Sequence, residues 1–251
     1  MNKLPKPYYA RDGITLYNDE CLDVLWRLGR SGEKFDGLVT DPPYASGGLH
    51  VGAKSAPTNK KYQQRETVKR HPDFGGDARD QLSWVHWCGI WINLCRKMLT
   101  PGAPVLMFCD WRQVGAAITS LQAGGIIYRG LIVWDKKNGR PAPGRFRAQC
   151  EYVLFGSNGA MPPRDLYLPG VFQHATVSGA GRMHASQKPI ALMKDLLQII
   201  PAGGRVLDPF AGSGSTLIAA DETGRKSVGI EESTEISQLL VSRIELKGIA
   251  A

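Results

Sequence analysis

The residues with the clearest chemical meaning are Asp41-Pro42-Pro43-Tyr44, which directly follow the apolar run 37–40. A short apolar run that ends at an acid and two prolines is typical of a strand passing into a rigid turn, because proline fixes the backbone and lacks an N–H. Such a turn holds a carboxylate and an aromatic ring at the carboxyl end of a strand, where open α/β sheets bind ligands. An ordinary turn with a capping aspartate explains these four residues about as well, so the motif alone does not establish a site.

A second motif at 206–216 reads Val-Leu-Asp-Pro-Phe-Ala-Gly-Ser-Gly-Ser-Thr. An apolar strand here enters a Gly-x-Gly turn and then a helical pattern, and glycine in such a turn lets a ligand approach the backbone closely. The next apolar run, 227–230, ends at Glu231, where an acid meets the hydroxyls of a ribose. A third glycine is replaced by Leu217 and there is no Gly-Lys-Ser/Thr. The pattern therefore predicts a nucleoside ligand without a pyrophosphate.

The chain carries 31 Lys and Arg against 23 Asp and Glu, a formal net charge of +8. An excess of this size indicates a polyanionic partner, usually nucleic acid. The charge gathers in two segments that are rich in Gly, Pro and amide residues and are therefore expected to be loops. The first holds Lys54, Lys60, Lys61, Arg65, Lys69 and Arg70, and the second holds Lys136, Lys137, Arg140, Arg145 and Arg147. This grouping favours a DNA-binding surface over charge spread evenly for solubility.

Strand-like apolar runs alternate with helical patterns along the chain, which is typical of an α/β domain. Strands are expected at 14–17, 37–40, 104–108, 130–133, 150–155, 205–207 and 227–230. Helices are expected at 21–28, 82–99, 111–123, 189–200, 215–223 and 233–246. The 251 residues show no repeat and no break in composition. We therefore expect a single domain, 1–251, built on a mostly parallel sheet with helices on both faces.

The two motifs together resemble the S-adenosylmethionine-dependent DNA amino-methyltransferases, in which Asp-Pro-Pro-Tyr is the catalytic motif and Asp-Pro-Phe-x-Gly-Ser-Gly the cofactor motif. Their order here, with the catalytic motif first, is similar to the β group of that family. Residues 17–21 are similar to its acidic turn near the cofactor's adenine, and 184–189, His-Ala-Ser-Gln-Lys-Pro, to its His-x-x-Gln-Lys-Pro element. The resemblance covers most of the chain and implies a Rossmann-like methyltransferase fold.

The resemblance also implies a role for each matching residue. Asp41 and the Pro42 carbonyl would accept the amino protons of a target base flipped out of the duplex, in the turn that Pro43 stiffens, and Tyr44 would stack on that base. The cofactor S-adenosylmethionine would be bound by Asp19, Glu20, Lys188, Asp208, Phe210, Gly212, Ser213, Gly214, Ser215, Thr216 and Glu231. No metal is expected, because the histidines outside the resembling element show no ligand spacing.

The implied activity is methyl transfer to the N6 amino group of adenine in double-stranded DNA. Relatives that methylate the N4 of cytosine often carry serine in place of the acid, so Asp41 favours adenine while cytosine stays open. RNA and protein methyltransferases usually have the cofactor motif first, and a DNA-binding protein without activity is disfavoured because every chemical group is present. Methylation at carbon-5 of cytosine needs a Pro-Cys nucleophile, which this sequence lacks.

DNA-recognition loops are expected at 45–81 and in 136–183, on both sides of the strand at 150–155. A homodimer is expected because two copies would cover a palindromic site, and because the Trp-rich helix at 82–99 has more large apolar residues than one core face needs. A cognate restriction endonuclease is a possible partner. No apolar run approaches the roughly 18 residues of a membrane span. The expected location is the cytoplasm, for a protein of bacterial or phage origin.

Overall fold

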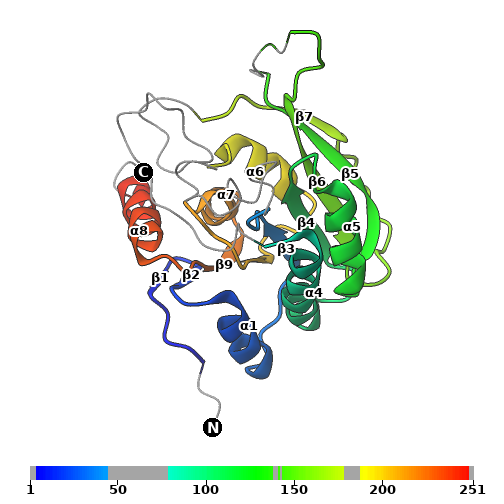
Figure 1. The fold of residues 1–251 in the computed structure, drawn as a ribbon. Coiled ribbons are helices and arrows are strands. Elements are labelled where there is room, and N and C mark those ends of the chain that lie inside the picture. The colour runs from blue at the N-terminus through cyan, green and yellow to red at the C-terminus, as the bar shows by residue number, and fades with distance from the viewer. Residues whose placement is uncertain (1–3, 45–78, 138–140, 142, 178–186, 249–251) are drawn as a thin grey trace.

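The structure is a computed structural model that describes residues 4–44, 79–137, 141, 143–177 and 187–248. Within these residues one sheet runs through the molecule in the strand order β1-β2-β9-β8-β3-β4-β6-β5-β7 (Figure 1). The strands are β1 (Tyr9–Arg11), β2 (Ile14–Tyr17), β3 (Gly37–Thr40), β4 (Pro104–Cys109), β5 (Ile127–Asp135), β6 (Cys150–Ser157), β7 (Val171–Gln173), β8 (Arg205–Asp208) and β9 (Lys226–Ile230). The helices are α1 (Cys21–Arg30), α4 (Gln81–Met98), α5 (Val114–Ala123), α6 (Ile190–Leu197), α7 (Ser215–Glu222) and α8 (Thr234–Gly248).

The strand directions decide which residues meet at the functional edge of the sheet. Strands β2, β9, β8, β3 and β4 are parallel, so their carboxyl ends lie along one edge. After β3 the chain continues to β4 on one side, and after β8 it continues to β9 on the other side. The boundary between β3 and β8 is therefore the topological switch point, where such sheets bind ligands. Because β6 runs antiparallel to β4, it brings its first residues, and not its last, to this edge.

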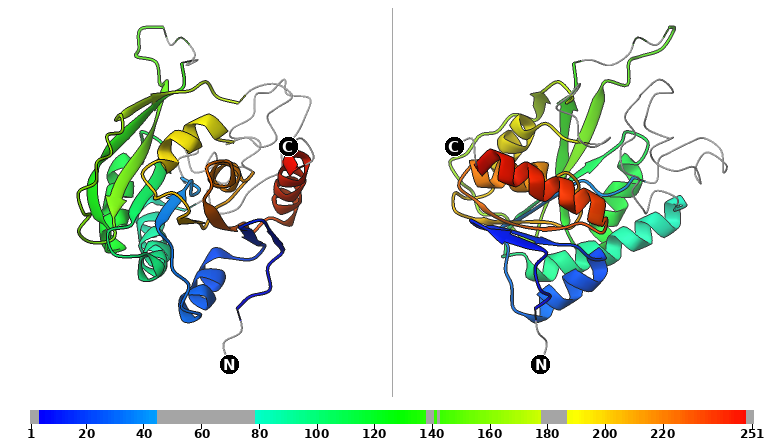
Figure 2. Two further views of the ribbon diagram at one scale, coloured as in Figure 1. Left: turned by 180° about the vertical axis from the view of Figure 1, so that it is seen from behind. Right: turned by 90° about the vertical axis from the view of Figure 1, so that its left-hand side faces the viewer.

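Helices cover both faces of the sheet (Figure 2). Helices α1, α4 and α5 pack on one face, and α6, α7 and α8 pack on the other. Successive residues of a central strand point to opposite faces of the sheet. Leu38 of β3 lies in the core under α1, α4 and α5, and Val39 lies in the core under α6 and α7. Burial on both faces explains why the central strands carry apolar residues at successive positions rather than at alternate ones. The predicted α/β sheet with helices on both faces is confirmed.

The expected strands and helices are all present, with shifted ends. The edge strands β1 and β7 were not expected, because three residues are too few to show an alternating pattern. The expected loop range 136–183 contains β6 and β7, so only the segments around these strands are free to act as loops. Most of the other expected loop, 45–81, lies outside the described residues, and α4 begins at its last residue. No helix of the described residues is long and apolar enough to cross a membrane.

Most large side chains of α4 lie inside the molecule, whereas Leu82 and Ile90 are exposed. Trp84 and Trp91 are fully buried, and Trp87 is partly buried against Phe210, with ring centroids 5.4 Å apart. These tryptophans are therefore not surplus residues for a dimer contact, and the predicted contact through this helix stays a prediction. Its tryptophans pack in the core and around the second motif because the helix lies directly against the sheet.

Candidate active site

Asp41 lies just after the carboxyl end of β3, and two groups hold its carboxylate. The Nζ of Lys188 donates to Oδ2 over 2.5 Å, and the hydroxyl of Tyr44 donates to Oδ1. The turn itself is anchored by the Pro43 carbonyl, which accepts the indole N–H of Trp84 at 2.7 Å. Burial raises the pKa of Asp41, while the Lys188 ammonium opposes this rise. The structure thus brings the predicted catalytic motif together around one partly buried acid.

Glu151 is a second carboxylate of this site, and the sequence analysis missed it. Its Oε1 accepts from Lys188 Nζ at 2.7 Å and lies 2.8 Å from the Tyr44 hydroxyl oxygen, and its Oε2 pairs with Lys136 Nζ at 3.1 Å. Burial acts to raise the pKa of Glu151, but Lys188 and Lys136 outweigh it and lower the pKa to about 2. The only signal in the sequence is an acid near the start of an apolar run, which any surface strand can show.

Lys188 is the cation between these two acids and is itself buried. Burial lowers the pKa of its ammonium, yet Asp41 and Glu151 together raise that pKa above its ordinary value. Its backbone carbonyl accepts the hydroxyl of Ser215, the first residue of α7, at 2.8 Å. The residue therefore lies at the catalytic motif through its side chain and at the second motif through its backbone.

Asp208 joins the two motifs. Its Oδ1 accepts the Thr40 hydroxyl from the end of β3 at 2.8 Å and the N–H of Phe210 at 3.1 Å. Burial raises the pKa of Asp208 to about 6, against hydrogen bonds from Thr216 and Thr40. With only 2% of its surface exposed, Asp208 shapes the turn between β8 and α7 from within.

Glu231 follows β9 and lies beside the same turn. Its Oε2 accepts the N–H of Gly212 at 3.0 Å, and its Oε1 accepts the N–H of Ser233 at 2.9 Å. Burial raises the pKa of Glu231 to about 7. A carboxylate oxygen has two lone pairs, so each oxygen retains one acceptor position for a further donor. Two hydroxyl groups on neighbouring carbons, as in a ribose, match these two positions.

The two glycines of the turn have different surroundings, although both have positive φ, +50° at Gly212 and +80° at Gly214. A Cβ on Gly212 would meet no atom within 4 Å, whereas a Cβ on Gly214 would lie 2.7 Å from Cγ of Leu240 on α8. The space over Gly212 is open to a ligand, and Gly214 allows α8 to pack closely.

These surroundings predict opposite outcomes for a matched pair of variants. Gly214→Ala should lower the free energy of unfolding by about 2–3 kcal/mol, because its methyl group clashes with Leu240 in a strained backbone conformation. Gly212→Ala should lower the free energy of unfolding by about 1 kcal/mol. It should weaken nucleoside binding more than Gly214→Ala does, because its methyl group occupies the open space over the turn. Thermal unfolding and calorimetric titration measure the two effects. Equal losses of binding in both variants would contradict this assignment.

Several residues predicted to bind a cofactor have structural roles. The Glu20 carboxylate caps α1, accepting the N–H groups of Leu22 at 2.8 Å and Asp23 at 3.1 Å. Asp19 is exposed and accepts the Glu20 N–H at 2.9 Å. The Ser213 carbonyl accepts from Arg243 of α8 at 2.7 Å. The first two contacts fix the start of α1 after β2, and the third joins the glycine turn after β8 to α8.

The predicted DNA-binding residues are placed unevenly. Lys54, Lys60, Lys61, Arg65, Lys69, Arg70 and Arg140 lie outside the described residues. Arg145 and Arg147 are exposed, and Lys137 follows β5 with a φ of 62°. Lys136 instead pairs with Glu151, which joins the start of the second basic segment to the two acids of the site.

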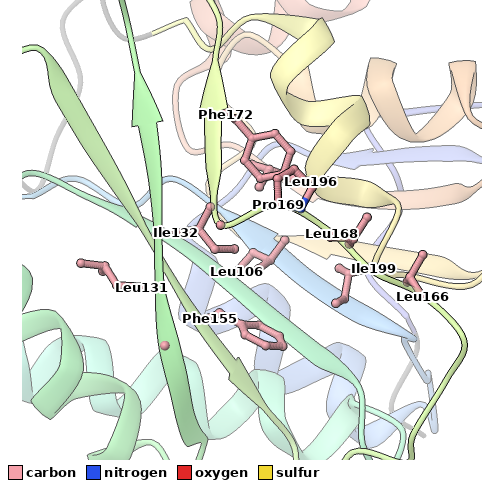
Figure 3. A pocket seen from close by; sticks show the side chains of 12 residues that line it. Leu106, Leu131, Ile132, Phe155, Leu166, Leu168, Pro169, Phe172, Leu196 and Ile199 are labelled. Carbon is pink, nitrogen blue, oxygen red and sulfur yellow. The ribbon is translucent and has the colours of Figure 1, made fainter.

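A separate apolar pocket of about 310 Å³ lies between the sheet and α6 (Figure 3). It is lined by Leu106, Gly130, Leu131, Ile132, Phe155, Leu166, Leu168, Pro169, Gly170, Phe172, Leu196 and Ile199. Because no charged side chain lines it, this pocket offers nothing to hold a cationic cofactor or the polar edge of a base. The polar site at the β3–β8 boundary is the better candidate for chemistry.

The sheet is mostly parallel, with a partly buried acid after β3, a glycine turn after the neighbouring β8 and a further acid after β9. This arrangement defines a class of enzymes that act with a nucleoside cofactor. The family model described as DNA methylase, covering N6 and N4 enzymes, matches residues 35–162 and 157–242. The chain belongs to this family, and the resemblance to DNA amino-methyltransferases is confirmed.

Individual relatives agree with this assignment. The chain is 43% identical to the Type II methyltransferase M.HindIII of Haemophilus influenzae, with 92% of this chain and 95% of the relative covered. Its fold is similar to that of M1.HpyAVI in complex with SAM, with a TM-score of 0.67 and 22% identity over 92% of this chain and 98% of that one. The cytosine-N4-specific PvuII DNA methyltransferase gives a TM-score of 0.69 and 16% identity over 95% and 88%. The Rossmann-like methyltransferase fold is thereby confirmed.

Proposed function

We propose that this DNA methyltransferase transfers a methyl group from S-adenosylmethionine to the N6 amino group of adenine in double-stranded DNA, with the target base flipped out of the duplex. The observation that carries the choice of base is the partly buried carboxylate of Asp41, paired with Lys188 at the carboxyl end of β3, where similar enzymes that methylate the N4 of cytosine often carry serine. A carboxylate is the strongest acceptor that a protein offers to an amino group.

The cofactor supplies a methyl group that is already activated on a sulfonium, so the protein has mainly to align the acceptor and activate it. The lone pair of an exocyclic amino group is delocalised into the ring of the base. Asp41 accepts one amino proton and the Pro42 carbonyl the other, which draws the nitrogen toward tetrahedral geometry. The Asp41 carboxylate then stabilises the positive charge that develops on this nitrogen and is placed to take its proton. The Tyr44 ring stacks on the base.

The described residues fit the cofactor. The open space above Gly212 admits a nucleoside to the backbone, and the two remaining acceptor positions of Glu231 match the ribose hydroxyls. The ring of Phe210, packed against Trp87 and Trp91, offers an apolar surface beside the turn.

Product analysis tests the base. The purified protein is incubated with DNA and tritiated S-adenosylmethionine, and the DNA is digested to nucleosides and separated. We expect the label in N6-methyldeoxyadenosine. Label in N4-methyldeoxycytidine would overturn the choice of adenine and leave the family assignment intact. Cytosine-N4 methylation is the second candidate because the PvuII enzyme shares the fold.

The exposed arginines after β5 are proposed to contact DNA phosphates. Replacing Arg145 and Arg147 together by glutamate should weaken DNA binding and reduce the slope of log affinity against log salt by about 2, since each lost contact releases about one counterion fewer. Arg11→Glu on the edge strand β1 is the control, and its DNA affinity should stay near the parent's. Fluorescence anisotropy at several salt concentrations measures both. An unchanged slope would remove these arginines from the interface.

We further propose a homodimer on the DNA, so that two reading surfaces related by a twofold axis match a palindromic site. The tryptophans of α4 do not support it, and the proposal rests on the small size of the chain and the symmetry of such sites. Light scattering of the protein with and without DNA tests it. A monomer in both states would rule it out.

A further inference from the structure

Two carboxylates in the site share one tyrosine hydroxyl. The Tyr44 oxygen lies within hydrogen-bond distance of Asp41 Oδ1 and 2.8 Å from Glu151 Oε1. A hydroxyl has a single proton, so Tyr44 can donate to only one of these acids at a time. The Lys188 ammonium has three protons and reaches both acids and, at 3.4 Å, the Tyr44 oxygen. The tyrosine proton is thus the one donor for which the two acids compete.

The direction of this proton matters for the reaction. With Lys188 on Oδ2 and Tyr44 on Oδ1, each oxygen of Asp41 already has one donor and keeps one acceptor position. An incoming amino group then meets an oxygen whose negative charge a charge-assisted hydrogen bond from the tyrosine already partly neutralises, so Oδ1 is a weaker acceptor. When the hydroxyl donates to Glu151 instead, Oδ1 of Asp41 is released. Lys136, 3.1 Å from the other oxygen of Glu151, keeps that acid charged and therefore a good acceptor.

We propose that Glu151 is a positioning residue for methyl transfer. It accepts hydrogen bonds from the Tyr44 hydroxyl and from one N–H of Lys188, and so leaves Asp41 Oδ1 free to accept a hydrogen bond from the amino group of the target base. This inference rests on the proposed function only because it requires that the methyl group is transferred to an exocyclic amino group. It holds equally for adenine and cytosine, because both bases present that group.

Glu151→Gln tests the proposal. The amide keeps the shape of the side chain but is a weaker acceptor, so the Tyr44 hydroxyl stays on Asp41. We expect the single-turnover rate of methyl transfer to fall by about 30-fold, while the dissociation constants for cofactor and DNA change by less than about threefold. The matched control is Glu222→Gln, which removes the acid of the Lys194–Glu222 pair at the end of α7 and should keep the parent rate.

A double-mutant cycle with Tyr44→Phe separates positioning from a merely structural role. Tyr44→Phe alone should slow transfer by less than about fivefold, because the ring still stacks and Asp41 Oδ1 is free. In the Glu151→Gln background, Tyr44→Phe should cause no further loss of rate, because it removes the hydroxyl that donates to Asp41 Oδ1 in that variant. If Glu151 only supports the fold, the two losses multiply.

The outcomes are distinct. A parental rate in Glu151→Gln, or multiplied losses in the double variant, overturns the role of Glu151. If circular dichroism shows that Glu151→Gln does not fold, the rate of Tyr44→Phe alone tests the proposal. A loss of rate in Tyr44→Phe as large as that in Asp41→Ala overturns the proposed role of Glu151. A parent protein that labels no DNA contradicts the proposed function instead.

Discussion

Replacing Asp41 by alanine is expected to lower the rate of methyl transfer on the order of 1,000-fold, the largest effect of any single change in this protein. The carboxylate acts on positive charge that develops on the amino nitrogen, so most of its contribution arises in the transition state. Cofactor affinity should therefore change by less than about tenfold. Single-turnover transfer of a tritiated methyl group and calorimetric titration of the cofactor measure the two quantities.

Asp41→Asn is the matched variant for this prediction, because it keeps the shape of the side chain and removes the charge. It should lose nearly as much activity as alanine if charge is the cause. It also leaves Lys188 paired with Glu151, which limits the loss of stability that follows when one partner of a buried pair is removed. An Asp41→Ala enzyme that keeps a tenth of the parent rate would contradict the proposed role of Asp41 in methyl transfer.

Replacing Glu231 by alanine is expected to weaken cofactor binding on the order of 100-fold, since two hydroxyl donors lose a charged acceptor. Burial raises the pKa of Glu231 to about 7, so the carboxylate becomes protonated as the pH falls below that value. The ionised form is the better acceptor, and cofactor affinity should therefore rise as the pH rises through about 7. Glu231→Gln should flatten this part of the profile.

The stability of the free protein should show the opposite sign. An acid whose pKa is raised on folding ionises more readily in the unfolded chain, so its contribution disfavours the fold as the pH rises from the ordinary glutamate range to about 7. Glu231→Gln should therefore be relatively more stable than the parent at pH 8 than at pH 4. The exposed Glu245→Gln on α8 is the control and should change neither profile. Unchanged cofactor affinity in Glu231→Ala would show that the ribose assignment is wrong.

Much of the fold followed from local patterns. The apolar runs in β3 and β8 could be located because a strand buried on both faces carries apolar residues at successive positions. The turns that follow them could be located because proline and glycine restrict or widen the backbone choices of their own residues. The carboxyl-edge rule then placed Asp41 and the glycine turn together before any distance was known.

Partnerships between distant residues were decided only by the tertiary structure. Glu151 stands at the start of a strand, where the carboxyl-edge rule does not look, and it reaches Asp41 because β6 pairs antiparallel with β4, with Tyr152 opposite Cys109. The sequence assigned Lys188 to the cofactor and Lys136 to DNA, yet both ammonium groups lie on these acids. Sequence determined the motifs because their chemistry is local. The structure decided the charge network because sheet order and strand direction depend on contacts between segments far apart in the chain.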